Sequence, residues 1–287
     1  MRAELAVQLG PAFLFMGTGT QRSRGQRGWV KVFPLVLLLL ALQAKHAAAG
    51  ALERAMLGKS AVVDLTHAWD GRQPSGGGPE HARLESQSEA ERTNTAPRPL
   101  QPDDLVTHLD LPASVVRGRP TAAQIPARDL FAHAVLVDIA ARVAQRADYR
   151  VTVEDLLAWE RRNGRIPKGS VVLLNTGWSR RWGDPARYLN LDSQGVPRVP
   201  GFSVNAITFL VSERDIRGVG LDTWGAEVPP GTHGADTETR PLLQAGKWQL
   251  VNLTNLDRLP AKGTKLVIAP LRLEAGSAPA RVIAILP

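Results

Sequence analysis

Apolar runs of strand length recur along the chain from Ser60 onward, and two longer segments between them have helical spacing. The runs predict strands over residues 60–67, 134–140, 171–175, 218–222, 248–253, 265–269 and 281–286. One helix is predicted from Thr152 to Asn163, because Thr152 is a suitable N-cap, Asp155 follows three residues later and Gly164 can close the last turn. A second is predicted from Ser203 to about Arg214. Strands outnumber helices, which indicates an α/β fold with a mixed sheet or barrel-like core.

The first part of the chain interrupts this pattern twice. Residues 70–102 are rich in Gly, Pro, Ser, Glu and Arg, which predicts a loop. Residues 1–49 have the parts of a secretory signal, namely a basic segment from Arg22 to Lys31, an apolar run from Phe33 to Leu42 and small residues at Ala47–Ala49. We therefore predict cleavage before Gly50, a folded domain over residues 50–287, and export to the periplasm or medium.

Two alternatives to cleaved export stay open. The segment could be an uncleaved anchor, or the start could be misassigned, which would leave the protein in the cytoplasm. The apolar run is short for a span of roughly 20 residues, so no membrane span is expected after cleavage.

Charge and cysteine content exclude several classes of protein. The net charge is +8, but residues 1–49 carry six basic groups and one acidic group, and the remainder carries only +3. No basic stripe with interleaved aromatic residues is found, which argues against nucleic-acid binding. The absence of cysteine excludes disulfides, cysteine-ligated zinc and a cysteine nucleophile.

One short segment has the composition of a metal site. His108 and Asp110 lie two residues apart, so on a strand both side chains point to the same face. Asp104 falls on that face as well, and Pro112 ends the strand. Oxygen and nitrogen donors of this kind suit one divalent ion such as Zn or Mn. The alternative is a polar strand end that only forms hydrogen bonds or faces water.

Short motifs in the same order as in a known family extend from about Ser60 to Pro287. They are Asp64-Leu-Thr-His67, Thr107-His108-Leu-Asp110-Leu-Pro112, Gln124-Ile-Pro126, Thr152-Val-Glu-Asp155, Thr176-Gly177-Trp178, Pro200-Gly201-Phe202-Ser203, Gly220-Leu-Asp222-Thr223 and Asn252-Leu-Thr-Asn255-Leu-Asp257. By these motifs the chain resembles the cyclase family of metal-dependent hydrolases, which includes bacterial kynurenine formamidase and related isatin and cyclic-amide hydrolases. The resemblance implies a swivelling β/β/α barrel-type domain, assembled as a homodimer or homotetramer.

The chain departs from the family at several functional positions. Asp104 stands where the family motif has its first histidine, and Ser114 stands where it has a histidine that acts as general acid or base. Downstream, Thr239 and Val251 occupy the positions of a ligand histidine and a ligand glutamate. The resemblance thus implies one ion at Asp104, His108 and Asp110, with Ser114 at the catalytic position.

Other polar and aromatic residues are candidates for the same site. Three groups in the loop before Thr239 could replace the missing ligands, although a solvated polar loop is the alternative: His233, Asp236 and Glu238. The family counterpart of His67 lines the pocket mouth, so His67 is a candidate for substrate contact or else a strand-end histidine bonded to backbone. Trp69 and Trp178 could wall an aromatic pocket or be plain core residues.

Two classes of function follow. The first is a metal-dependent hydrolase of a carbon–nitrogen bond in a small formyl-amide or cyclic amide, resembling the arylformamidase of tryptophan breakdown to kynurenine. The second is a catalytically impaired family member that serves as a ligand-binding or assembly module. A serine hydrolase is rejected, because no Gly-x-Ser-x-Gly motif is present.

Overall fold

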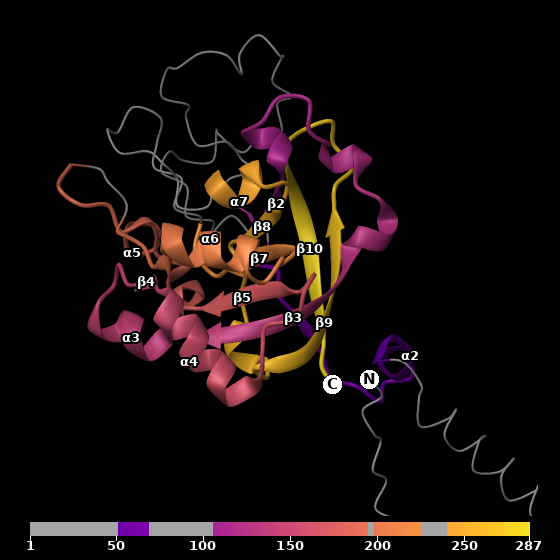
Figure 1. Cartoon of the computed structure of the whole chain (residues 1–287), viewed down its shortest axis with the longest axis horizontal. Helices are drawn as coiled ribbons and strands as arrows, with labels where there is room; N and C mark the ends of the chain where they lie inside the picture. Colours follow the sequence, from indigo (N-terminus) through magenta and orange to yellow (C-terminus); the bar gives the residue numbers. More distant parts are fainter. Residues whose placement is uncertain (1–50, 69–105, 195–197, 225–239) are drawn as a thin grey trace, which may run out of the picture. The chain divides into compact units, whose positions relative to one another are not determined.

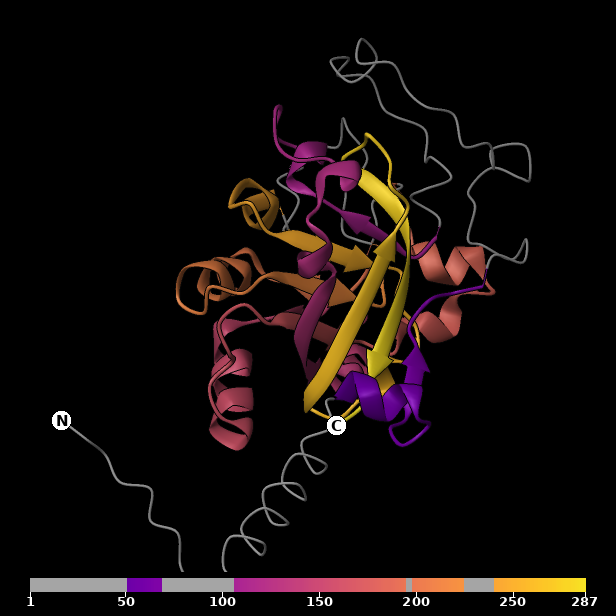
Figure 2. The same cartoon turned by 90° about the vertical axis from the view of Figure 1, so that its right-hand side faces the viewer.

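A computed structural model describes residues 51–68, 106–194, 198–224 and 240–287 of the chain, all within one compact unit, Gly50–Pro287. Its main sheet contains β1 (Val62–Asp64), β2 (His108–Asp110), β3 (Phe131–Asp138), β5 (Val171–Asn175), β7 (Gly218–Leu221), β8 (Trp248–Val251), β9 (Lys262–Pro270) and β10 (Ser277–Ile285). The strand order is β1-β10-β2-β8-β7-β5-β3-β9, and β9 also pairs with β10. That additional pairing closes the strands from β10 to β9 into a barrel, with the two long strands β9 and β10 side by side (Figures 1 and 2).

The sheet is mixed. Strands β3, β5, β7 and β8 run parallel, whereas β1, β2, β9 and β10 form antiparallel pairs. Strands β1 and β2 pair with different parts of the same edge of β10. A small second sheet joins β4 (Arg150–Val151) to β6 (Gly201–Phe202). The predicted α/β barrel with a mixed sheet is confirmed.

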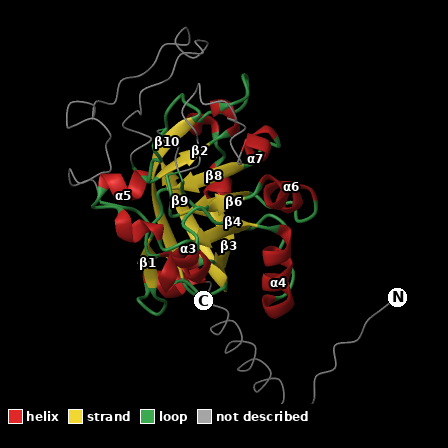
Figure 3. Cartoon of the chain, turned by 90° about the vertical axis from the view of Figure 1, so that its left-hand side faces the viewer, coloured by secondary structure: helices red, strands yellow, loops and turns green. Residues whose placement is uncertain are grey.

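Helices cover part of the outer face of the barrel. They are α2 (Ala51–Met56), α3 (Ala140–Gln145), α4 (Val153–Asn163), α5 (Pro185–Leu189), α6 (Val204–Ser212) and α7 (Arg240–Gln244). Short 3-10 turns are η4 (Pro112–Ser114), η5 (Ala122–Gln124), η6 (Ala127–Leu130), η7 (Trp178–Arg181) and η8 (Leu256–Arg258). Helices α4 and α6 pack next to each other on one side, and α5 lies on another (Figure 3).

Alternation along the strands produces two cores. On β5, Val171 and Leu173 point into the barrel, where they join side chains from β2, β8, β9 and β10. Val172 and Leu174 point outward and pack under helical residues such as Trp159 of α4. Residues on β2 and β8 follow the same rule, so Leu109 and Leu250 are inside and Val251 is outside.

Most elements agree with the sequence predictions. The cap of α4 is confirmed, because the Thr152 hydroxyl accepts from the Asp155 backbone N–H at 3.4 Å and the Asp155 carboxylate accepts from the Thr152 N–H at 3.0 Å. Gly164 ends this helix with φ of 85°. Helix α6 ends at Ser212, two residues earlier than predicted, and residues 51–56 form a short helix for which no element was predicted. The predicted signal segment and the loop over residues 70–102 lie outside the described residues.

Within the described ranges, no helix is both long and apolar enough to cross a bilayer.

Close backbone packing at Gly276 fixes the end of β2. The Gly276 carbonyl accepts from the Leu111 N–H at 2.8 Å, and a Cβ at residue 276 would lie 2.3 Å from the Ser114 nitrogen. Gly276→Ala should therefore lower the free energy of unfolding by about 2–3 kcal/mol, since the backbone of η4 must shift. Gly183→Ala is the matched control, because nothing lies within 4 Å of its added methyl group. Urea unfolding of both variants checks this, and equal effects would contradict it.

Candidate active site

His108 and Asp110 lie on the outer face of β2, alternating with the inward-pointing Leu109. Their side chains are buried, with 3% and 8% of each residue exposed. The His108 Nε2 atom is 3.5 Å from the Asp110 Oδ1 atom. Pro112 opens the turn η4 that ends the strand. The sequence prediction that these two side chains share a face is confirmed.

The ring of His108 has a defined orientation. Its Nδ1 atom lies 2.8 Å from the carbonyl oxygen of Val106. A carbonyl oxygen can only accept, so Nδ1 carries a proton and Nε2 is the atom that faces Asp110. Histidines that bind metals in proteins donate their other ring N–H to a carboxylate, a water or, as here, a backbone carbonyl. The ring is therefore oriented as a metal ligand would be.

The carboxylate of Asp110 is held in a charged state. Gln249, its cross-strand neighbour on β8, donates from Nε2 to Asp110 Oδ2 at 2.9 Å. Burial acts to raise the pKa of Asp110, but the charge and hydrogen bonding of His108 and the hydrogen bond from Gln249 outweigh it, so the pKa lies below its ordinary value. Asp110 is thus an ionised oxygen donor at neutral pH.

The pair fits two adjacent ligands of one divalent ion. Ligand atoms about 2.1 Å from a tetrahedral Zn lie about 3.4 Å apart, close to the 3.5 Å between His108 Nε2 and Asp110 Oδ1. Among the described residues, however, no three His, Asp or Glu side chains gather as a metal site. The other candidates lie outside the described residues: Asp104, His233, Asp236, Glu238, Thr239 and Trp69.

Two of the positions at which the chain departs from the family motif lie within the described residues, namely Val251 and Ser114. Val251 lies directly opposite His108 on β8, and it is fully buried and supplies no donor atom. Ser114 is exposed, and its hydroxyl donates to the Leu111 carbonyl at 2.7 Å. The proton of Ser114 is thus used within its own turn, which makes it a poor general acid or base.

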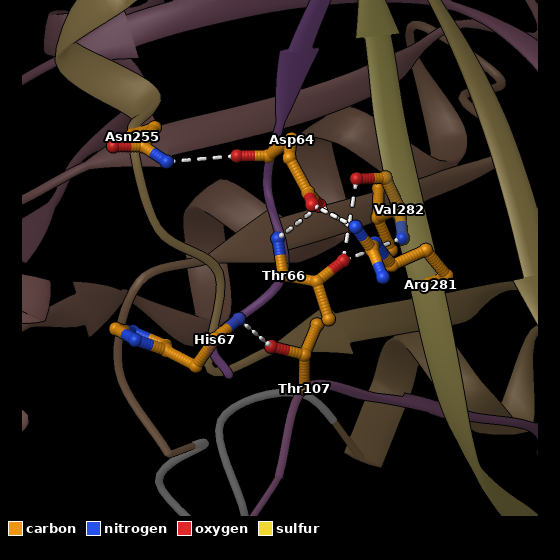
Figure 4. Close-up of polar contacts among 7 residues, drawn as sticks. All are labelled: Asp64, Thr66, His67, Thr107, Asn255, Arg281 and Val282. Carbon is orange, nitrogen blue, oxygen red and sulfur yellow. Dashed lines mark hydrogen bonds and ion pairs between the residues drawn. The ribbon is translucent and has the colours of Figure 1, made fainter. Parts of the chain in front are cut away.

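His67 reaches the region of β2 through the end of β1 (Figure 4). Asp64 pairs with Arg281 and accepts the Thr66 N–H at 3.1 Å, while the Thr66 hydroxyl accepts from the Val282 N–H at 2.8 Å and holds this segment to β10. The backbone N–H of His67 then donates to the Thr107 hydroxyl at 3.0 Å. Since Thr107 immediately precedes His108, this bond ties the end of β1 to the start of β2.

Aromatic rings continue from His67. Its ring is stacked on Trp182, with centroids 3.8 Å apart, and Trp182 meets Tyr188 edge-on at 5.1 Å. Sequence reasoning missed Trp182 and Tyr188, although Trp182 lies only four residues after the Trp178 that it selected. Of the two interpretations of Trp178, pocket wall or core, its geometry favours the core, because its side chain is fully buried and its indole N–H donates to the Tyr188 carbonyl at 2.8 Å.

The carboxyl ends of β5, β7 and β8 contribute buried polar groups at the same end of the barrel. Asp222, just after β7, accepts from the N–H and hydroxyl of Thr176 at 3.1 and 2.6 Å, and from the Trp178 N–H at 2.9 Å. Burial raises the pKa of Asp222 to about 6, against the effect of these bonds. Asn252 follows β8. Ligands of open α/β sheets bind at such carboxyl ends.

Comparison with known proteins identifies the family of the chain. The model of the Cyclase family, described as "Putative cyclase", matches residues 63–228. The chain belongs to the cyclase family. An isatin hydrolase from Roseibium aggregatum is 32% identical over 193 residues, which cover 63% of this chain and 71% of that protein.

Two solved structures extend the comparison. Isatin hydrolase A from Ralstonia solanacearum has 28% identity and a TM-score of 0.68, with 94% of this chain and 100% of that chain covered. A "predicted metal-dependent hydrolase" from Bacillus stearothermophilus has 25% identity and a TM-score of 0.54, with 78% of this chain and 98% of that chain covered. The barrel fold expected from the motifs is thus the fold of the cyclase-family hydrolases.

Proposed function

We propose that this protein is a metal-dependent hydrolase that cleaves a carbon–nitrogen bond in a small cyclic amide or aryl formyl-amide. The observation that carries the proposal is the buried pair on β2, in which His108 turns Nε2 toward an ionised Asp110 at 3.5 Å. Membership of a family that includes isatin hydrolase supports the reaction type. If the substrate is an aryl formyl-amide, the proposed hydrolase is an arylformamidase.

The residues on β2 would hold one ion, Zn or Mn. When bound, such an ion lowers the pKa of a coordinated water and polarises an amide carbonyl. Without a proton on Nε2, His108 would supply a neutral nitrogen donor, because its other proton is on Nδ1 and hydrogen-bonded to the Val106 carbonyl, and Asp110 would supply a charged oxygen donor. The buried position of both groups strengthens their interaction with a cation.

An aromatic substrate is favoured by the rings that follow His67, whose backbone is bonded to Thr107 at the start of β2. His67 and Trp182 are stacked, and planar aromatic amides can pack against such rings. His67 is partly exposed, so it can meet a ligand, whereas the fully buried Trp178 cannot. We therefore keep His67 as the substrate-contacting residue, with the buried Trp182 stacked against its ring as support.

One observation favours the second candidate, a non-catalytic binding or assembly module. Val251 places an aliphatic side chain opposite His108, where the family motif has a ligand. Such a relative would keep the barrel and lose the ion. It would bind small aromatic amides without hydrolysing them.

Hydrolysis assays of the purified protein separate the two candidates. Isatin and an N-formyl arylamine are offered to chelator-treated protein, with and without added Zn or Mn. We expect cleavage only after metal is restored, because the attacking water needs the ion to lose its proton near neutral pH. Cleavage that survives chelation would contradict the metal dependence. Binding without cleavage under every condition would favour the non-catalytic module.

A further inference from the structure

Two buried side chains share the carbonyl oxygen of Val106. The His108 Nδ1 atom lies 2.8 Å from it, and Asn252 donates to it from Nδ2 at 2.7 Å. A carbonyl has two lone pairs, so these two donors together satisfy it. The position of this oxygen therefore depends on Asn252 as much as on His108.

The orientation of the Asn252 amide is itself determined by a neighbour. The Tyr188 hydroxyl lies 2.8 Å from Asn252 Oδ1 but 3.4 Å from the alternative acceptor, the Asp222 carbonyl. The Val106 carbonyl can only accept, so Nδ2 faces it and Oδ1 accepts from the Tyr188 hydroxyl, the shorter of that hydroxyl's two contacts. Tyr188 is fully buried, and burial with the nearby Asp222 raises its pKa well above the usual value, so it keeps the proton that it donates.

The backbone of Asn252 holds the same segment from a second side. Its carbonyl accepts from the Thr107 hydroxyl at 2.6 Å, and its N–H donates to the Thr223 carbonyl at 2.8 Å. Asn252 has φ of 54°, a left-handed conformation that asparagine tolerates better than most residues. Val106 and Thr107, which lead into His108, are thus clamped by one residue at the end of β8.

We propose that Asn252 and Tyr188 are positioning residues that keep a proton on His108 Nδ1, hydrogen-bonded to the Val106 carbonyl, and so present Nε2 to a metal ion. The chain of donors runs from the Tyr188 hydroxyl through the Asn252 amide to the Val106 carbonyl. The value of this arrangement for an ion rests on the proposed function. The ring orientation itself can be measured in metal-free protein.

The decisive variant is Asn252→Asp, which keeps the size and the acceptor for Tyr188 but removes the donor to Val106. An oxygen then faces the Val106 carbonyl, repels it and frees the His108 ring. Asn255→Asp is the matched control: Asn255 lies three residues on, has φ of 57° and donates Nδ2 to the Asp64 carbonyl at 2.8 Å. It makes the same kind of bond without touching Val106.

Two measurements on the full-length protein test the proposal. Nitrogen NMR of ¹⁵N-histidine-labelled, metal-free protein, under alkaline conditions in which the ring holds one proton, reports which ring nitrogen of His108 is protonated; His108→Gln assigns the signal among the six histidines. We expect Nδ1–H in the wild type and in Asn255→Asp, and a mixture of both forms in Asn252→Asp. Zn affinity, measured by competition with a chelating dye, should fall by about 10–100-fold in Asn252→Asp only.

Each outcome decides between the alternatives. An Nδ1–H form and a Zn affinity unchanged in Asn252→Asp would overturn the proposal. If Asn252→Asp does not fold, Tyr188→Phe decides instead, because it leaves the Nδ2 donor but frees the amide; a partial shift toward Nε2–H supports the proposal and no shift overturns it. If the NMR result holds but the wild type binds no Zn, the positioning stands and the proposed function fails.

Discussion

Asp110→Ala should abolish both bound metal and hydrolysis. Asp110 is the only carboxylate described beside His108, and its side chain is buried. Loss of a supporting group around a metal costs about 10–100-fold in affinity, and loss of a ligand itself should cost more. The change also leaves the Gln249 amide without its acceptor, which should lower the free energy of unfolding by about 1–3 kcal/mol. Elemental analysis and the amide assay give the result.

The control for this change is Asp257→Ala. Asp257 is half exposed and pairs with Arg180 at 3.2 Å on the surface, so its removal should leave metal and turnover unchanged. Asp110→Asn separates charge from shape, because it keeps the size of the side chain while losing the anion. Hydrolysis that persists in Asp110→Ala at the wild-type rate would show that β2 does not carry the site.

Asp222→Ala should be the most destabilising single change among the described residues that we consider. Asp222 is fully buried and accepts from the Thr176 N–H, the Thr176 hydroxyl and the Trp178 N–H. Each buried donor left without a partner costs about 1–3 kcal/mol, so we expect a loss of about 3–5 kcal/mol in the free energy of unfolding. Urea denaturation followed by tryptophan fluorescence measures it.

Asp138→Ala is the matched control for Asp222→Ala. Asp138 ends the parallel strand β3 and accepts the Ala140 N–H two residues on at 2.9 Å, but it is exposed. In the variant, water can accept the single hydrogen bond from the Ala140 N–H, so the loss in the free energy of unfolding should stay at about 0.5–1 kcal/mol. Similar losses of unfolding free energy at both positions would contradict the claim that the buried hydrogen bonds of Asp222 stabilise the fold more than an exposed one does.

The raised pKa of Asp222 also predicts a pH dependence with a definite sign. The pKa is about 6 in the folded protein and near 3.8 in the unfolded chain, so the folded state binds more protons between these values. Stability contributed by this group is therefore present below about pH 4 and lost as pH rises to about 6, by at most about 3 kcal/mol. Asp64, Asp110 and Glu160 have lowered pKa values and act in the opposite direction.

Comparison with Asp222→Asn isolates the contribution of this one carboxyl group. The difference in free energy of unfolding between wild type and variant should fall as pH rises from 4 to 6 and then stay level. A difference that is constant over this range would contradict the raised pKa.

Local sequence patterns predicted the elements that depend on local rules. The capping box of α4 needs only Thr152 and Asp155, and the shared face of His108 and Asp110 needs only the alternation of a strand. Both therefore followed from neighbouring residues. The barrel class followed from the family motifs, which sample most of its strands.

Other features depend on contacts that no short pattern encodes. Trp178 and Trp182 are four residues apart, yet one is a core residue that donates to Tyr188 and the other stacks on His67 from β1. The Asn252–Val106 hydrogen bond joins residues 146 positions apart. Such contacts depend on the order of the strands in the closed sheet, which places β2 next to β8.

Metal content per chain is the most direct test of the central claim that His108 and Asp110 form a metal site. Elemental analysis follows gel filtration of the protein in trace-metal buffer, with Asp110→Ala analysed in parallel. We predict about one Zn or Mn per chain in the wild type and none in the variant. No stoichiometric metal in the wild type, or one ion per chain retained by Asp110→Ala, would contradict the claim.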